Sequence, residues 1–256
     1  MAAKGRWLVK LSLGMLVLSG CTVLEGSGVP AEDSRDVQGF AAVANMTSVR
    51  VNVVPSEQDD VLVYCDDNII DSIETRIHGN WLEIRTPNNV SIHPDVACGV
   101  DVTASTLRAV DSSGSGNIVA EGDWPDLEDV SSSGSADVRV VGRLPSLSNV
   151  DSSGSGQITV DGVEAAEVHI DTSGSGDIDA LGTTDSFSFD SSGSGEIDAM
   201  ELHAIDGDVD SSGSGDVRLF ATGHVRIDLS GSGDVVVAGG ASKDVDNSGS
   251  GEVIER

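Results

Sequence analysis

Apolar and polar residues alternate through the second half of the chain in a unit of about twenty residues that recurs eight times. Each unit surrounds a Gly-Ser-Gly core, which becomes Gly-Ser-Ala once. The first glycine of the core falls at Gly114, Gly134, Gly154, Gly174, Gly193, Gly213, Gly231 and Gly249. A fixed period near twenty residues indicates a repeat architecture, in which stacked units share one core.

Two positions are apolar in every unit: the fourth residue before the first glycine and the fourth residue after it. They lie eight residues apart, an even number, so in an extended chain both side chains point to the same side. We expect that side to be the interior. The first column holds Val110, Val130, Val150, Ile170, Phe189, Val209, Ile227 and Val245, and the second Ile118, Val138, Ile158, Ile178, Ile197, Val217, Val235 and Val253.

The positions three residues from the glycine are polar and are expected to face water. The column before the glycine is Asp111, Ser131, Asp151, Asp171, Asp190, Asp210, Asp228 and Asp246, and the column after it is Asn117, Asp137, Gln157, Asp177, Glu196, Asp216, Asp234 and Glu252. Parity puts the residue two before the glycine, which is Ser or Thr in six units, on the inner side.

The repeated glycines are expected where stacked chains pass closely over a narrow interior. The second glycine is replaced by Ala136, which tolerates positive φ badly, so lack of space explains that position better. The first glycine is never replaced, which leaves a positive φ possible there. The pattern as a whole predicts a parallel β-helix with rungs about 4.8 Å apart. Antiparallel hairpins are the alternative, but they would not require the same residue in every unit.

Residues 36–108 lack the core but alternate like strands, for example at Val49–Val53 and Trp81–Arg85. Turn residues such as Pro55 and Gly79 separate these runs. We interpret residues 36–108 as opening rungs and a cap, since an open rung would expose an unpaired edge. Residues 109–256 form the eight repeats.

The stretches Arg35–Phe40, Asp66–Ile73, Gly79–Ile84 and Ser105–Arg108 occur in that order before the first repeat. This succession, over roughly residues 36–256, resembles the auto-transporter adhesin head GIN domain family. The resemblance implies a right-handed parallel β-helix, similar in shape to pectin lyases, together with a cell-envelope location and an adhesive role. It carries over no catalytic residue, and adhesion is itself inferred from the fold.

The first twenty residues are typical of an export signal: Lys4, Arg6 and Lys10 precede an apolar run that is short for a membrane span. The run ends in Leu18-Ser19-Gly20-Cys21, which resembles the bacterial lipobox. We therefore predict lipidation of Cys21; an ordinary signal peptide is the alternative. Thr22 in place of Asp favours the outer membrane, by resemblance to Gram-negative lipoproteins. Residues 21–35 are predicted to be a flexible tether.

The net charge limits the classes of partner, and the two remaining cysteines predict a crosslink. The 14 basic residues oppose 43 acidic ones, for a net charge of -29, which argues against nucleic acid as a partner. Expected partners are the membrane, through the lipid, and an envelope polysaccharide or surface protein. Cys65 and Cys98 are predicted to form a disulfide, because export favours oxidation; two buried free thiols are the alternative.

The acidic columns suggest a hypothesis of Ca²⁺ binding, because hard cations prefer oxygen ligands. The candidate ligands are Asp151, Asp171, Asp190, Asp210, Asp177 and Asp216; the alternative is a solvated acidic wall with loose counterions. No other cofactor is expected. The five His share no register with the repeat, so no catalytic triad can be proposed. We expect a non-enzymatic, lipid-anchored structural or adhesive module. The alternatives are a Ca²⁺- or polysaccharide-binding solenoid and, less favoured, a degenerate polysaccharide-lyase-like enzyme.

Overall fold

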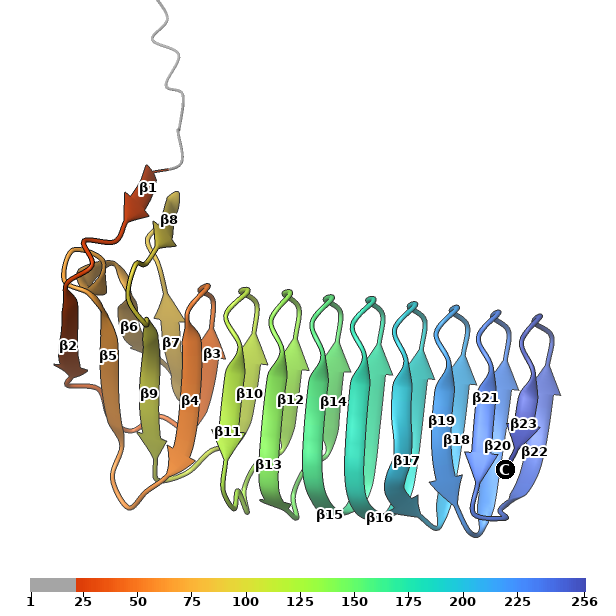
Figure 1. Cartoon of the computed structure of the whole chain (residues 1–256). Coiled ribbons are helices and arrows are strands. Elements are labelled where there is room, and N and C mark those ends of the chain that lie inside the picture. The colour runs from red at the N-terminus through yellow and green to blue at the C-terminus, as the bar shows by residue number, and fades with distance from the viewer. Residues whose placement is uncertain (1–21) are drawn as a thin grey trace, which may run out of the picture.

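The structure is a computed structural model that describes residues 22–256, so the predicted signal peptide and Cys21 lie outside the described residues. It is a β-solenoid: a row of stacked rungs with a smaller group of strands at the N-terminal end (Figure 1). The predicted all-β parallel stack is confirmed. No helix among residues 22–256 has the length and apolar character needed to cross a bilayer.

Each repeat contributes one strand before the core and one after it, joined by a loop that contains the core. Equivalent strands of successive units pair in parallel and in register, so that Val130 pairs with Val150 and Val138 with Ile158. Strands before the core are β10 (Ala109–Ser112), β12 (Asp129–Ser132), β14 (Asn149–Ser152), β18 (Asp206–Ser211), β20 (His224–Leu229) and β22 (Ser242–Asn247). Strands after it are β11 (Ile118–Glu121), β13 (Val138–Leu144), β17 (Ile197–Ala204), β19 (Val217–Ala221), β21 (Val235–Ala238) and β23 (Val253–Glu255), while β15 (Ile158–Thr172) and β16 (Ile178–Ser191) each run from one core to the next.

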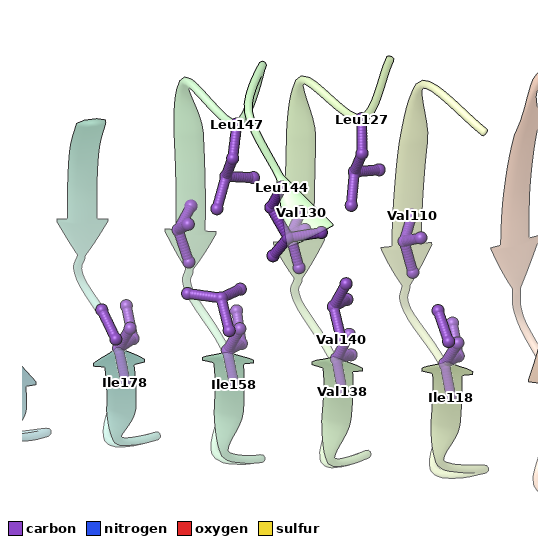
Figure 2. Packing of buried hydrophobic residues seen from close by; sticks show 14 of the residues in the cluster. Val110, Ile118, Leu127, Val130, Val138, Val140, Leu144, Leu147, Ile158 and Ile178 are labelled. Atoms are coloured by element: carbon purple, nitrogen blue, oxygen red, sulfur yellow. The ribbon is translucent and has the colours of Figure 1, made fainter. Parts of the chain in front are cut away.

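The two apolar columns meet inside the stack, where Figure 2 shows them repeated from rung to rung. Val150 and Ile158 are fully buried, as are their counterparts in neighbouring units. Burying one Val or Ile side chain stabilises the fold by about 1.5–3 kcal/mol, and each rung contributes at least two. The last unit has no rung above it, so Val245 is 42% exposed.

The core loops stack through hydrogen bonds that all run in one direction. The N–H groups of Ser153 and Ser155 donate to the carbonyl oxygens of Ser132 and Gly134 in the preceding unit, both at 2.9 Å. A Cβ added to Gly154 would overlap the carbonyl oxygen of Gly134. None of the glycines in the cores has a positive φ. Both glycine columns therefore reflect lack of space, which settles the question left open for the first glycine.

A third column of glycines lies at the opposite turn of the rung, eight residues after the first glycine. Gly122, Gly142, Gly162 and Gly182 have φ between +99° and +138°, a conformation that disfavours any other residue. These glycines turn the chain back towards the next strand. In β15 and β16 the strand continues through this turn, with a shift of register between Asp161 and Val163.

The opening rung is formed by β3 (Ala42–Asn45) and β4 (Arg50–Pro55), which pair in parallel with β10 and β11. The cap beyond it contains β5 (Asp60–Asp66), the 3₁₀ helix η1 (Ile70–Ser72), β6 (Glu74–His78), β7 (Trp81–Arg85), β8 (Val90–His93) and β9 (Gly99–Ala104). Here parallel and antiparallel pairs alternate: β4 lies parallel to β9, and β9 lies antiparallel to β5.

The predicted tether is wrong for residues 22–35. These residues form β1 (Thr22–Glu25), which pairs in parallel with β8, and β2 (Pro30–Arg35), which pairs antiparallel with β5. The physical reason is that pairing with the cap gives hydrogen-bond partners to the backbone N–H and C=O groups of this segment, although its side chains are small and polar. The chain is thus bound to the cap from the residue after Cys21 onwards.

Candidate functional site

The acidic column after the core is a ladder of hydrogen bonds between side chain and backbone. A carboxylate or amide oxygen in one unit accepts the N–H of the equivalent residue in the next unit. Asp216 Oδ1 accepts the N–H of Asp234 at 2.8 Å, and Asp234 Oδ1 accepts that of Glu252 at 2.9 Å. The same bond is made by Asn117, Asp137 and Asp177. These acids hold the loops together and are more than a solvated wall.

Side-chain length decides which residues can make this bond. Every Asp or Asn in the column that has a following unit makes it, whereas Gln157 and Glu196 do not in the described part of the chain. Their side chains reach elsewhere: Gln157 Nε2 donates to Asp179 Oδ2 at 2.6 Å, and Glu196 forms an ion pair with Arg218 at 2.6 Å. The extra methylene moves the oxygen past the N–H of the next rung.

The acidic column before the core is stacked in register, with Asp151 opposite Asp171 and Asp190 opposite Asp210. A serine relieves the mutual repulsion at one rung, and the pKa of Asp151 reflects burial and repulsion at another. Ser131 Oγ donates to Asp111 Oδ1 at 2.8 Å. Partial burial raises the pKa of Asp151, and the charge of Asp171 raises it further, against an opposing effect of His169.

A second group of acids surrounds Arg218 on the strands that follow the core. The guanidinium lies 2.6 Å from Glu196 Oε1 and 3.3 Å from Asp198 Oδ2. Burial raises the pKa of Glu196; Arg218 opposes this shift and Asp198 adds to it. Burial and then the charge of Asp198 raise the pKa of Asp179. One arginine therefore compensates two carboxylates of the preceding rung.

The six predicted Ca²⁺ ligands belong to two separate columns. Asp151, Asp171, Asp190 and Asp210 lie on the strands before the core, whereas Asp177 and Asp216 lie just before the strands that follow it. Within residues 22–256, no three His, Cys, Asp or Glu side chains are grouped so that they could hold a metal ion. Specific Ca²⁺ binding stays an untested hypothesis.

The loop edge of the rod carries a groove of about 680 Å³ that crosses the last five units. It is lined by serine and glycine alone, from Ser173–Ser175 to Ser248–Ser250. The serine hydroxyls on either side of each first glycine are exposed, which makes two parallel rows of hydroxyl groups. Such a surface can donate and accept hydrogen bonds along its whole length.

The segment that follows Cys21 is fastened to the cap by buried Asp66. Its carboxylate accepts the N–H groups of Gly28 at 2.7 Å, Asp95 at 2.9 Å and Val96 at 3.3 Å. Burial alone would raise the pKa of Asp66, but these N–H bonds outweigh it and lower the pKa. The neighbouring Asn68 donates to Glu25 O at 2.8 Å. The family resemblance includes this stretch but implies no role for Asp66.

Cys65 and Cys98 are joined by a disulfide with an S–S distance of 2.10 Å, as predicted from their number and from export. Cys65 lies on β5 opposite Ala31 of β2, so the crosslink lies beside the strand that carries the N-terminal segment. The disulfide and the Asp66 contacts thus hold the same part of the cap.

Comparisons with known proteins agree with this architecture. Residues 39–241 match the family model described as "Putative auto-transporter adhesin, head GIN domain". No protein of curated function matches the chain significantly.

The fold resembles several solved structures. A protein from Parabacteroides distasonis described as a putative lipid binding protein has 23% identity and a TM-score of 0.82, over 92% of this chain and 100% of that one. A putative adhesin from Parabacteroides merdae has 19% identity and a TM-score of 0.80, over 91% and 99%. A putative adhesin from Bacteroides fragilis has 20% identity and a TM-score of 0.69, over 91% and 100%.

These identities support the fold alone, whereas the family model covers most of the chain. The family's description names an adhesin and no enzyme. On the strength of that match, this chain belongs to the auto-transporter adhesin head GIN domain family.

Proposed function

We propose that this protein is a lipid-anchored module of the cell envelope that holds a rigid acidic rod away from the membrane and makes structural or adhesive contacts through it. The observation that carries the proposal is the attachment of β1 to the cap directly after Cys21. An acyl group on Cys21 would hold the capped end at the bilayer, with the repeats extending from it.

Charge supports this orientation. The surface columns are mostly Asp and Glu, and the whole chain has a net charge of -29. Anionic lipid headgroups attract basic segments, so an acidic rod is repelled from such a surface and does not lie along it. The repeats and their serine groove would then face away from the membrane.

The serine groove is the surface that best suits an extended polar partner such as an envelope polysaccharide. Its two rows of hydroxyls cross five units without a break. Many weak hydrogen bonds along a polymer add up, as in any multivalent contact. A surface protein with exposed polar strands is the other partner that we consider.

Anchoring is tested by producing the full chain and a Cys21→Ser variant in a Gram-negative host. We expect the unaltered chain in the outer-membrane fraction and the variant in the soluble fraction. Protease treatment of intact cells then separates a surface-exposed rod from a periplasmic one. A variant that still fractionated fully with membranes would contradict the lipid anchor.

Adhesion is tested with beads that carry the protein and are passed over immobilised envelope polysaccharides. Ser194→Arg combined with Ser214→Arg obstructs the groove. Thr183→Arg combined with Thr222→Arg, at exposed positions of the opposite turn, is the control with the same added charge. We expect the groove variant to lose retention and the control to keep it. Equal retention of all three would refute the role of the groove.

A further inference from the structure

Six hydroxyl groups form a column inside the stack, two residues before the first glycine. They belong to Ser112, Ser132, Ser152, Thr172, Ser191 and Ser211, each at most 2% exposed. None has a hydrogen-bond partner among the described residues. A buried hydroxyl without a partner costs about 1–3 kcal/mol, so six of them would lower the free energy of unfolding considerably.

The same column shows which groups such a side chain faces. In the opening rung the position is taken by Asn45, which pairs in register with Ser112. Asn45 is fully buried, and its Nδ2 donates to two carbonyl oxygens, Val49 O at 2.9 Å and Gly116 O at 2.8 Å. One of these carbonyls belongs to the same rung and the other to the next.

The last unit repeats this arrangement independently. Asn247 occupies the column there, and its Nδ2 donates to Gly251 O at 2.9 Å. At both ends of the stack an amide group thus donates to the carbonyl oxygen of the residue four positions after it, which in the repeats is the residue two after the first glycine. A serine hydroxyl lies one bond closer to the backbone than the asparagine amide nitrogen, so it stops before this carbonyl oxygen.

The column has room for more than a serine. Leu229 is fully buried at the same position of the seventh unit, and its Cδ2 would lie 3.3 Å from a Cβ built on Gly251. Asn and Leu each extend three heavy atoms beyond Cβ, whereas Ser extends one. The difference of two heavy atoms corresponds to about 30 Å³, the share of volume of one water molecule in the liquid.

We propose that a row of structural water molecules, the water file, lies inside the stack. The file has one water in each of the six Ser and Thr rungs, in the space that the core loop encloses (the lobe). Each water accepts a hydrogen bond from the hydroxyl group of its Ser or Thr. It donates to two carbonyl oxygens, one of its own rung and one of the next, equivalent to those that Asn45 Nδ2 reaches in the opening rung. That gives each water three hydrogen bonds, the usual number for a buried water. Asn45 closes the file at one end and Leu229 at the other.

The proposal is tested by oxygen-17 magnetic relaxation dispersion, which counts water molecules that stay bound long enough to tumble with the protein. Ser152→Asn and Ser191→Asn each supply the amide that replaces one water. We expect each variant to fold, to melt no lower than the unaltered protein and to lose about one long-lived water. Ser153→Asn, at the adjacent exposed position, should leave the count unchanged.

Several results would overturn the water file. The unaltered protein could lack long-lived waters in this number, or both variants could keep the full count. Failure of both variants to fold would show that the lobe has no room for the amide, and so none for a water. Each of these outcomes is independent of whether the protein is anchored or adhesive.

Discussion

The bond from Asp216 to the N–H of Asp234 allows two opposing effects of the acidic column to be separated. In Asp216→Asn the side-chain oxygen still accepts the N–H, while the negative charge is removed. In Asp216→Ala both are lost. Neighbouring carboxylates about 5 Å apart repel by about 0.8 kcal/mol in bulk water, and a net hydrogen bond contributes about 0.5–1.5 kcal/mol. Because loss of the repulsion stabilises both variants equally, the difference in stability between Asp216→Asn and Asp216→Ala measures the hydrogen bond.

We expect Asp216→Asn to be at least as stable as the unaltered protein and Asp216→Ala to be about 1 kcal/mol less stable than Asp216→Asn. In a domain of this size that is a gap of about 2–4 °C in Tm. Asp216→Glu should be less stable than Asp216→Ala, because it keeps the repelling charge and its longer side chain misses the N–H, as that of Glu196 does. Thermal unfolding followed by circular dichroism measures all three.

The matched control is the exposed Asp126, which makes no such bond within the described residues. Asp126→Asn and Asp126→Ala should have the same Tm as each other. The reasoning is refuted if Asp216→Asn and Asp216→Ala also melt together, since the column would then act only through charge.

Three further predictions concern charge, crosslink and space. The folded pKa of Asp151 is raised, so its contribution to stability is largest below its unfolded value of 3.8 and is lost as pH rises through the folded pKa. Asp151→Asn should therefore raise Tm near pH 7 and lose this advantage towards pH 3.8; a constant advantage in melts across this range would contradict the sign. Cys65 and Cys98 are 33 residues apart, so reducing their disulfide should destabilise the cap by about 4 kcal/mol through the entropy of the opened loop. Denaturation of the protein with and without reductant measures this loss. The stability of Cys98→Ser should not depend on reductant. Gly174→Ala should lower Tm more than Gly176→Ala, because a unit with alanine at the second position exists naturally; equal melting of the two would show that both columns are equally crowded.

The repeat could be interpreted from the sequence because its inward columns are set by parity and burial alone. Val150, Ile158 and their counterparts lie inside as predicted, and the hydroxyl of Ser152 is buried with them. These positions depend only on the period of an extended chain, which the sequence displays.

The acidic ladder was missed because its role depends on which loop N–H groups lack a carbonyl partner. A signal was present: the column after the core prefers the short side chains of Asp and Asn, and Glu196 is one of its few long members. The glycines of the opposite turn were also visible, since Gly142 and Gly162 repeat with the same period. The N-terminal segment was mistaken for a tether because its partner, Asp66, lies 38 residues from Gly28.

Because the loops of every unit donate hydrogen bonds to the unit before it, the contacts between neighbouring units are equivalent along the whole stack. Removing the twenty residues 134–153 would bring equivalent atoms into the same bonds and leave both ends of the rod unchanged. The rod would become shorter by one rung, about 4.8 Å. Gain or loss of a repeat therefore adjusts the reach of this protein without any redesign of its cap or its last rung.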